Sequence, residues 1–147
     1  MKSIHSTSVE QTQAIGERLG RALFPGAFVA LIGDLGAGKT AFSQGIARGL
    51  GIRGRVPSPT FVLVQVHEGG RLPLWHADFY RLGDESELET LGFDERGDAV
   101  LVAEWADRFV VASDRLEVRI TEVGEGRRIE AQGYGAAHDQ LEVCFAE

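Results

Sequence analysis

The first element that the hydrophobic pattern predicts is an amphipathic helix. Apolar side chains recur at every fourth position, the spacing of one helix face, at Ile15, Leu19 and Leu23. Ser8 and Gln11 have the spacing of a capping box, in which Ser8 caps the helix and Gln11 reaches back. Pro25-Gly26 then ends the helix, because neither residue suits a helix interior.

A buried strand and a second helix follow. Residues 27–32 (AFVALI) are almost wholly apolar, which is typical of a strand buried on both faces of a parallel sheet. Helical spacing returns after it, at Phe42, Ile46 and Leu50. Gly51 is placed to end this second helix. The glycine-rich stretch 33–38 therefore predicts a loop between a buried strand and a helix.

The rest of the chain is richer in strand patterns. Strands are predicted over 60–66, 72–80, 100–103, 115–122 and 127–132. Loop and turn residues predict a loop at 57–59 and hairpin turns at 68–71 and 124–126, and 84–91 predicts a helix. An α/β first half and a β-rich second half predict one α/β domain over 1–147. Its central sheet is expected to be mixed, parallel and antiparallel, with flanking helices.

Composition narrows the class of protein. A chain of 147 residues with 44% hydrophobic and 25% charged residues has the profile of one soluble globular domain. The net charge of −7 argues against a protein whose main function is to bind nucleic acid directly, because phosphate backbones favour clustered Lys and Arg. A nucleic-acid pathway in which partner proteins hold the nucleic acid remains compatible with this charge.

Cysteine content and the apolar runs bear on the compartment. Cys144 is the single cysteine, which rules out internal disulfides and fits a reducing environment. No apolar run approaches the ~20 residues that cross a bilayer. The N-terminus lacks the apolar core of a secretory signal. We therefore expect a cytoplasmic protein without a membrane association.

The glycine-rich loop carries the strongest chemical signal. Residues 33–40 (GDLGAGKT) match the phosphate-binding pattern GxxxxGK[ST] at every fixed position. Glycines let successive backbone N–H groups turn inward on a phosphate, and the dipole of the following helix favours the same anion. The residues expected to bind the nucleotide here are Gly33, Leu35, Gly36, Ala37, Gly38, Lys39, Thr40 and Ala41.

Three side chains or amides of this motif have distinct expected roles. Lys39 places a positive charge toward the β- and γ-phosphates, Thr40 offers its hydroxyl to Mg²⁺, and the Ala41 N–H reaches the α-phosphate. The alternative is a tight strand-to-helix turn with an exposed lysine. The predicted strand before the loop and helix after it favour the phosphate-binding interpretation, and with it a P-loop NTPase fold.

The base is expected to be adenine. GTPases usually select guanine with an Asn-Lys-x-Asp motif, and this chain contains no asparagine. Residues 94–97 (DERG) match the short switch pattern DxxG, but this pattern is weak and we interpret it as a surface turn. We therefore expect ATP, with Mg²⁺, as the ligand.

Two acids are candidates for metal or water positioning. Glu104 ends the predicted strand 100–103, and Asp78 lies near the end of the strand 72–80. Mg²⁺ needs oxygen ligands beyond Thr40 and the phosphates, so an acid at a strand end fits. The alternative for each is an acid that faces water, the commonest situation of Asp and Glu. The pattern leaves open which of the two contacts the metal.

Four further residues are weaker candidates. Trp105 either contacts the nucleotide or packs in the core, and Thr60 either brings its hydroxyl to the γ-phosphate or only begins a strand. Arg127 is expected to be solvated or to reach the nucleotide. His76 fits a packed strand residue.

The motifs together resemble one family. They are residues 33–40 (GDLGAGKT), 58–61 (SPTF), 76–82 (HADFYRL) and 104–105 (EW). In this order and spacing the chain resembles the TsaE family, formerly called YjeE, of small bacterial P-loop ATPases in tRNA threonylcarbamoyladenosine (t6A) synthesis. The resemblance extends from Ser8 to Gly133. Family members often have proline after the Glu-Trp pair, whereas this chain has Ala106.

The resemblance implies a function and a set of partners. It implies a compact ATPase with Thr40 and Glu104 near Mg²⁺ and with Asp78 important for turnover. It also implies docking on a complex of TsaD and TsaB, which installs the group on tRNA, so that tRNA is reached only indirectly. In that interpretation Lys39, Thr60, Asp78 and Glu104 act in catalysis, without this chain transferring the group itself.

Two other functions share the phosphate loop. A small phosphotransferase would need an acceptor pocket and usually a lid that carries arginine, for which the chain has little room. A regulatory module would sense ATP without useful hydrolysis, which the presence of both Asp78 and Glu104 argues against. Turnover measured with a small acceptor, with protein partners and alone distinguishes the three.

Overall fold

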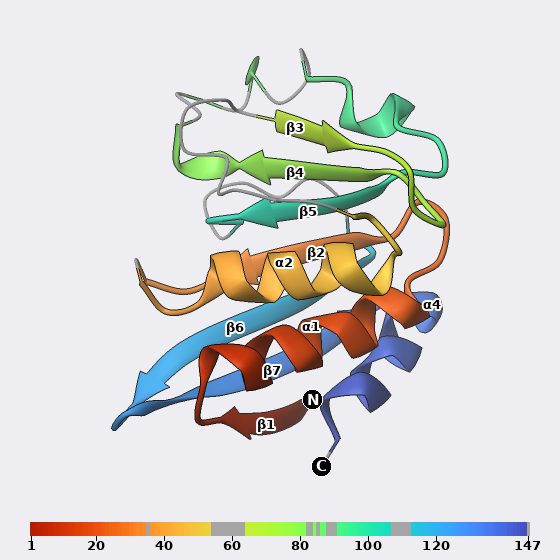
Figure 1. Cartoon of the computed structure of the whole chain (residues 1–147). Coiled ribbons are helices and arrows are strands. Elements are labelled where there is room, and N and C mark those ends of the chain that lie inside the picture. The colour runs from red at the N-terminus through yellow and green to blue at the C-terminus, as the bar shows by residue number, and fades with distance from the viewer. Residues whose placement is uncertain are drawn as a thin grey trace.

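A single mixed sheet forms the centre of the molecule. The computed structural model describes residues 1–34, 36–53, 64–81, 84, 86–87, 91–106 and 113–146. Within these, the strands are β1 (Lys2–Ser6), β2 (Phe28–Ile32), β3 (Val64–His67), β4 (Leu74–Asp78), β5 (Val100–Glu104), β6 (Arg115–Val123) and β7 (Gly126–Tyr134). They are ordered β1-β7-β6-β2-β5-β4-β3 (Figure 1). The mixed α/β architecture predicted from the sequence is confirmed.

Parallel pairing is confined to the middle of the sheet. Strand β2 pairs in parallel with β5 on one side and β6 on the other, and β4 pairs in parallel with β5. The hairpins β3–β4 and β6–β7 and the pair β1–β7 are antiparallel. Every residue of β2 is buried, as expected for an apolar central strand with parallel neighbours. The carboxyl ends of β2, β4, β5 and β6 consequently share one edge.

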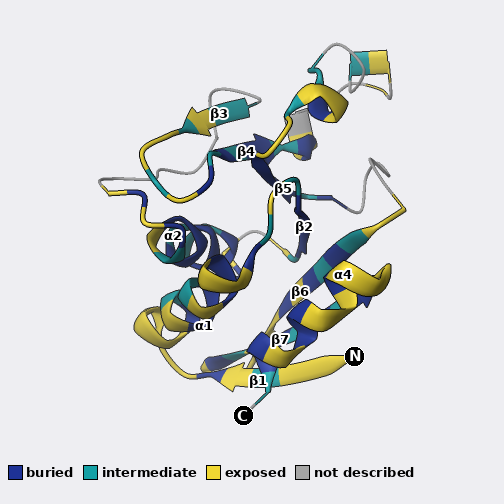
Figure 2. Ribbon diagram, turned by 90° about the vertical axis from the view of Figure 1, so that its right-hand side faces the viewer, coloured by how far each residue is buried: buried dark blue, intermediate teal, exposed yellow. Residues whose placement is uncertain are grey.

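Two helices, α1 (Val9–Ala22) and α2 (Lys39–Gly49), cover one face of the sheet. They lie side by side in both views (Figures 1 and 2). Leu19, Phe42 and Ile46 are fully buried beneath them against the inward side chains of the central strands. A second cluster on the opposite face contains Phe28, Leu101 and Phe79. No helix in the described part of the chain is both long and apolar enough to span a membrane.

Four glycines set the distance between α1 and α2. A Cβ at Gly16 or Gly20 would overlap a carbonyl oxygen of α2, and a Cβ at Gly45 or Gly49 would overlap a carbonyl oxygen of α1. The two helix backbones are therefore in direct contact, which small residues at spacing four permit. This contact fixes α2, whose first turn follows the phosphate loop, relative to the rest of the molecule.

The N-terminus of α1 departs slightly from the predicted capping box. Ser8 is the N-cap, and its hydroxyl accepts from the Gln11 amide at 3.1 Å, as expected. The Gln11 side chain, however, accepts from the amide of Thr7 at 2.7 Å rather than from that of Ser8. The Thr7 hydroxyl also donates to the same oxygen, so the Gln11 side chain bonds to the residue before the one that the capping box predicts.

Strand β4 is shorter than its sequence pattern. The prediction ran to residue 80, but the strand ends at Asp78 and a 3-10 turn, Phe79–Arg81, follows. The Asp78 carboxylate accepts from the Tyr80 amide at 3.0 Å. This local bond competes with continued strand pairing, since Asp side chains readily bond backbone two residues on. Only residues 64–66 of the predicted strand 60–66 are described, and the helix predicted over 84–91 lies largely outside the described residues.

The remaining predictions concern the ends of the chain and its turns. The hairpin turn predicted at 124–126 is confirmed, with Val123 opposite Gly126, which already begins β7, and a short 3-10 helix, Phe93–Glu95, overlaps the start of the surface turn predicted at 94–97. Sequence analysis predicted neither β1 nor the C-terminal segments α4 (Ala136–Asp139) and 3-10 Gln140–Phe145. Phe145 packs near Phe42, with ring centroids 6.1 Å apart, so the C-terminal segment completes the core under α2.

His138, in α4, holds the start of the central strand. Its Nε2 accepts a hydrogen bond from the Phe28 amide at 3.1 Å, and its ring packs edge-on against Phe24. Burial lowers the pKa of His138, opposed by the nearby charge of Asp114 and assisted by that of Arg96. A neutral imidazole is required here because an imidazolium has no acceptor nitrogen.

We predict that Gly45→Ala destabilises the fold although alanine favours helices. The added methyl overlaps the Gln13 carbonyl, which belongs to backbone and cannot rotate away. The free energy of unfolding should fall by about 1–3 kcal/mol, net of a helix-propensity gain of about 1 kcal/mol. Urea unfolding measures it. Arg48→Ala, exposed on the same helix, is the control and should change stability by less than about 0.5 kcal/mol.

We predict that stability falls below about pH 6.5, the pKa of an unfolded histidine, partly through His138. Since the pKa of His138 is lowered in the folded state, the unfolded chain takes up the proton first as pH falls, and the full contribution is present only above that pH. His138→Gln keeps an acceptor that does not titrate. Urea unfolding at pH 7.5, 6.5 and 5.5 should show a shallower loss in this variant. An equal loss of stability in His138→Gln and wild type would contradict the prediction. His67, whose pKa is also lowered by burial, contributes to the loss in both proteins.

Candidate functional site

The phosphate loop joins the end of β2 to the start of α2. Gly36 and Gly38 have φ values of +81° and +114°, which side-chain-bearing residues rarely adopt. Gly38 is the N-cap of α2 and, having no side chain, supplies no side-chain cap to this helix. The N-terminus of a helix favours an anion, through its N–H groups and its dipole.

Lys39 is buried rather than exposed. Only 5% of the residue is accessible, which argues against the simple turn with a solvated lysine. Its ammonium donates to the carbonyl oxygens of Gly33 and, at 2.8 Å, Asp34, and it lies 4.1 Å from the centre of the Trp105 ring. The charge is thus held inside the loop, beside the uncapped end of α2.

Two acids stand at the carboxyl edge of the parallel strands. The β4–β5 register pairs Asp78 with Glu104, and the β2–β5 register pairs Leu31 with Glu104. Glu104 is 5% exposed, and its Oε2 lies 2.6 Å from Nε2 of His76. Parallel pairing thus brings the candidate acids, from strands far apart in sequence, to the end of the sheet where the phosphate loop begins.

Trp105 has an unusual backbone. Its φ is +60°, the only non-glycine residue with positive φ in the described part of the chain. Such a conformation costs about 1–3 kcal/mol and persists only where its surroundings enforce it. The indole lies against the Tyr80 ring, with centroids 5.1 Å apart and planes inclined at 46°, and covers the Lys39 ammonium. Trp105 therefore belongs to the candidate site rather than only to the core.

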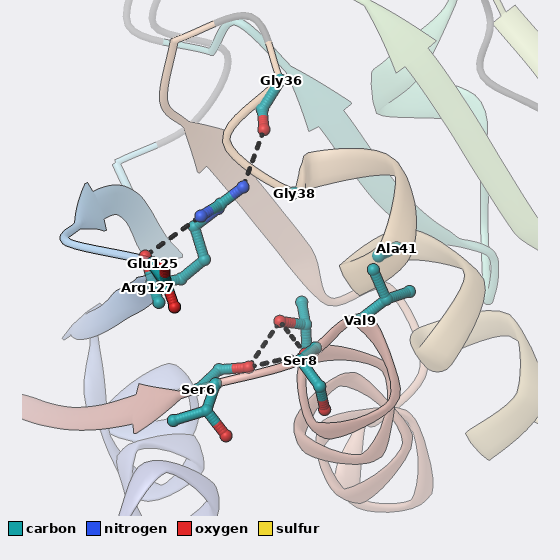
Figure 3. Close-up of a pocket in the computed structure, with 11 residues that line it drawn as sticks. Ser6, Ser8, Val9, Gly36, Gly38, Ala41, Glu125 and Arg127 are labelled. Atoms are coloured by element: carbon teal, nitrogen blue, oxygen red, sulfur yellow. Dashed lines mark hydrogen bonds between the residues drawn. The ribbon is translucent and has the colours of Figure 1, made fainter.

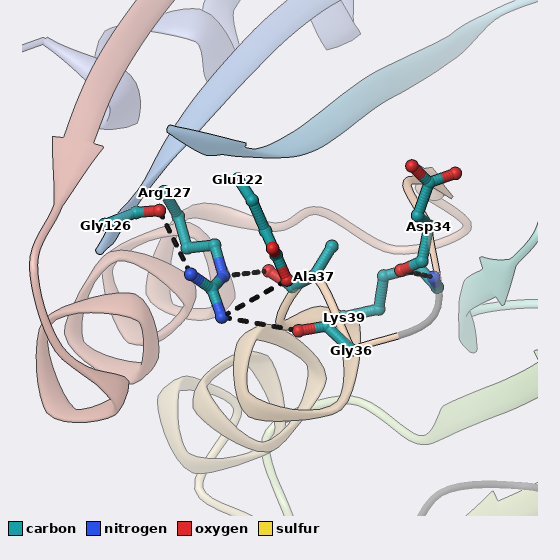
Figure 4. A network of polar contacts seen from close by, with 7 residues as sticks. All are labelled: Asp34, Gly36, Ala37, Lys39, Glu122, Gly126 and Arg127. Carbon is teal, nitrogen blue, oxygen red and sulfur yellow. Dashed lines mark hydrogen bonds and ion pairs between the residues drawn. The ribbon is translucent and has the colours of Figure 1, made fainter. Parts of the chain in front are cut away.

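Arg127 braces the phosphate loop from the β6–β7 hairpin (Figure 4). Its Nε donates to the Ala37 carbonyl at 2.9 Å and Nη2 to that of Gly36 at 3.4 Å. Nη2 also lies 3.6 Å from a carboxylate oxygen of Glu122. These contacts hold loop carbonyls outward, and direct contact of Arg127 with a nucleotide stays a prediction. Its neighbour Arg128 is exposed.

A cavity of about 270 Å³ opens beside the loop (Figure 3). Three segments line it: the β1–α1 junction with Ser6 and Val9, the loop and α2 with Gly38 and Ala41, and the start of β7 with Arg127. A second, more polar cavity of about 370 Å³ lies against β6, beside Asp34 and Arg119. The phosphate loop thus lies between two hollows.

Most predicted site residues come together around the loop. Gly33, Gly36, Ala37, Gly38, Lys39, Thr40 and Ala41 lie along the loop and the first turn of α2. Asp78, Glu104 and Trp105 lie at the adjoining strand ends, whereas Leu35 and Thr60 fall outside the described residues. The sequence pattern predicts His76 as a packed strand residue and does not predict its contact with Glu104. The signal available was a histidine inside an apolar strand, two residues before Asp78.

The described residues contain no group of three or more His, Cys, Asp or Glu side chains that could hold a metal ion by themselves. Thr40 and Glu104 could supply two oxygen ligands. Mg²⁺ commonly binds through one or two carboxylates plus substrate phosphates and waters, so two protein ligands suffice. The arrangement is suited to a metal that arrives with a phosphate ligand.

Comparison with known proteins agrees with this geometry. A family model described as "Threonylcarbamoyl adenosine biosynthesis protein TsaE" matches residues 6–129. The chain belongs to the TsaE family. A Bacillus subtilis relative named "tRNA threonylcarbamoyladenosine biosynthesis protein TsaE" is 43% identical over 123 residues, 81% of this chain and 77% of the relative. A Streptomyces coelicolor protein of the same name is 46% identical over 112 residues, 72% of this chain and 76% of its own.

A solved structure extends the TsaE likeness to the fold. The crystal structure of Bacillus subtilis YdiB superposes with a TM-score of 0.79 at 33% identity, covering 95% of this chain and 89% of that one. The family resemblance inferred from four short motifs is confirmed. It covers nearly the whole sheet, including both hairpins, so the TsaE assignment does not depend on the phosphate loop alone.

We predict that Arg127→Ala loosens the phosphate loop of this TsaE-family chain. The Ala37 amide is bonded to the Asp34 carbonyl at 3.1 Å, and Arg127 anchors the same peptide segment. Loss of a charge-assisted bond should raise hydrogen exchange of this amide about tenfold or more. NMR exchange rates measure it. Arg128→Ala, the exposed neighbour, should leave the rate within about twofold, and equal rates in the two variants would contradict the bracing role.

Proposed function

We propose that this TsaE-family chain is a Mg²⁺-dependent ATPase of t6A synthesis in tRNA. The observation that carries the proposal is the juxtaposition of an uncapped helix N-terminus with a buried lysine and a buried carboxylate. The loop amides and Lys39 suit phosphate, and Glu104 suits a metal or an attacking water. The t6A assignment comes from the names of its relatives.

The residues fit the phosphate tail of a nucleotide. Among the described residues other than its chain neighbours, none has an atom within 4 Å of a Cβ built at Gly36, and methyl groups of Thr12 and Ile120 approach one at Gly38 at 3.8 and 3.9 Å. The glycines therefore leave open space on the loop that side chains would fill. A β- or γ-phosphate would attract the Lys39 ammonium away from the Gly33 and Asp34 carbonyls, because an anion is a stronger acceptor than a peptide oxygen.

The cavity beside Ala41 suits the nucleoside. Its volume of about 270 Å³ is near the lower end for ligand pockets, ~300–1,000 Å³, which fits part of a ligand whose phosphates lie on the loop. Val9 is an exposed apolar side chain in the wall, while Ser6 and Ser8 add hydroxyls. We therefore propose that the base and ribose lie toward the β1–α1 junction and that the phosphates lie toward Glu104.

Mg²⁺ would be held by Thr40, Glu104 and the phosphates, where its charge would offset the charge that develops on the transferred phosphoryl group. Glu104 would hold its carboxylate at the edge of the loop, and Asp78, opposite it in the register, would orient water. Lys39 would stabilise negative charge on the leaving oxygens. Turnover is proposed to be slow alone and faster on a TsaD–TsaB complex, with tRNA reached only through that complex.

We predict that Lys39→Ala weakens ATP binding at least tenfold, about 1.4 kcal/mol. The substitution removes the positive charge buried beside the loop. Calorimetric titration with Mg²⁺-ATP measures the affinity, and thermal melting checks the fold. The control is Lys2→Ala, the chain's other lysine, which is exposed on β1. Unchanged affinity in Lys39→Ala would contradict the phosphate-loop assignment.

We predict that Glu104→Ala still binds ATP but hydrolyses it about 10²-fold more slowly on the partner complex. Much of the phosphate affinity comes from backbone amides, whereas the carboxylate acts on metal or water. Turnover is measured alone and with TsaD and TsaB, and Asp78→Ala should behave similarly. Glu68→Ala, at an exposed turn, is the control. Wild-type turnover in Glu104→Ala would exclude a catalytic role for this acid.

The pathway has its own test. Depletion of the protein should lower t6A in cellular tRNA, measured by mass spectrometry of digested tRNA. Normal t6A in depleted cells that hold no second such gene would contradict the pathway while leaving the ATPase proposal standing.

A further inference from the structure

His76 and Glu104 form a polar pair inside an apolar layer. His76 is fully buried and Glu104 nearly so, on the sheet face that α1 and α2 cover. Leu74 and Val102, which belong to that apolar cluster, come two residues before His76 and Glu104 on their strands. Burying polar groups is costly unless each is hydrogen-bonded. Packing alone therefore does not explain why this polar pair is buried here.

The strand register fixes the pair in place. In the parallel β4–β5 ladder His76 lies opposite Val102 and Asp78 lies opposite Glu104. Side chains alternate between faces along a strand, so His76, Asp78 and Glu104 project from the same face. His76 is thus one step deeper in the sheet than the two acids, behind Glu104 as seen from the phosphate loop.

The contact has a definite direction. Nε2 of His76 lies 2.6 Å from Oε2 of Glu104, and a carboxylate that ligates a metal is deprotonated and can only accept. In the proposed metal site the imidazole is consequently the donor through Nε2–H. This bond occupies one carboxylate oxygen and leaves the other, Oε1, for the site.

The second imidazole nitrogen separates this pair from an ordinary structural histidine. Nδ1 of His76 is buried and has no hydrogen-bond partner among the described residues. His138, by contrast, uses its buried ring to hold a backbone amide. His76 makes its one side-chain hydrogen bond in the described part of the chain to Glu104, so its orientation serves the carboxylate.

We propose that His76 is a positioning residue that orients Glu104 for Mg²⁺. The proposal rests on the proposed function, because it assigns the metal to the Glu104 carboxylate. Hydrogen bonds to ligating carboxylates fix their orientation, and their loss typically costs about 10–100-fold in metal affinity. His76 itself touches neither metal nor nucleotide.

Two amide variants isolate the Nε2 donor. In His76→Gln the amide nitrogen can occupy the place of Nε2 and still donate to Glu104. In His76→Asn the amide reaches only the place of Nδ1, so the bond to Glu104 is lost while a polar side chain remains. Calorimetric titration with ATP, in excess EDTA and at a series of Mg²⁺ concentrations, gives the Mg²⁺ concentration for half-maximal tightening of binding.

The expected result is specific to the metal. His76→Asn should raise that Mg²⁺ concentration at least tenfold, and His76→Gln should leave it within about threefold of wild type. Affinity for ATP in EDTA should be the same in all three proteins, which also shows that the variants are folded. Equal Mg²⁺ responses in His76→Asn and wild type, or equal losses in both variants, would overturn the positioning role.

A measurement on the unmodified chain keeps the test independent of variant folding. Long-range ¹⁵N–¹H NMR spectra should show the His76 ring protonated at Nε2. A proton on Nδ1 alone would overturn the proposal whatever the variants do. If wild-type affinity for ATP does not respond to Mg²⁺ at all, the metal part of the proposed function fails and this proposal fails with it. If wild-type affinity does respond to Mg²⁺ but both variants respond in the same way as wild type, the positioning role fails and the proposed function survives.

Discussion

The parallel pairing of β2 with β5 is the constraint on which the candidate site depends. It brings the carboxyl ends of two strands, more than seventy residues apart in the chain, to the same edge. The phosphate loop leaves one end and Glu104 terminates the other. A one-residue slip of β5 would turn Glu104 to the opposite face of the sheet, into the apolar cluster of Phe28 and Leu101. The core thereby fixes the position of the acid relative to the loop.

The loop itself is held by contacts from three directions. The glycine-mediated contact of α1 with α2 fixes the helix that follows it. Arg127 binds loop carbonyls from the β6–β7 hairpin, and Lys39 binds the carbonyls at its start. A preorganised anion site needs this bracing, since backbone amides can converge on a phosphate only where the loop does not collapse on itself. The hydrogen bonds of Arg127 and Lys39 thus orient the loop carbonyls away from the loop amides.

Trp105 shows how strain is balanced at the edge of the site. Its left-handed backbone is unfavourable by about 1–3 kcal/mol. The tilted ring contact with Tyr80 and the contact with the Lys39 ammonium each contribute about 0.5–2 kcal/mol in return. The contacts are of the same size as the strain, so the conformation depends on Lys39 remaining where it is. A ligand that draws Lys39 toward phosphate would remove part of that balance.

Local patterns in the sequence determined the phosphate loop, its flanking strand and helix, both hairpins and the TsaE family. These depend on interactions within a few residues, such as glycine conformations, helical spacing and alternation. The short edge strand β1 has one apolar residue, Ile4, and the apolar residues Leu141, Val143 and Phe145 of the C-terminal segment are not at helical spacing although the segment forms a 3-10 helix. Both segments are ordered by tertiary contacts, through pairing with β7 and packing near Phe42.

Tertiary structure alone decided which polar residues meet. Sequence could nominate Glu104 and Asp78 as strand-end acids, but it gave His76 no partner, because that partner lies on another strand 28 residues away. It likewise could not assign Arg127 to the loop carbonyls across 90 residues, or give Trp105 a left-handed backbone. Such contacts follow from strand order and register, which short-range spacing does not encode, since the same side chains would be solvated in a different topology.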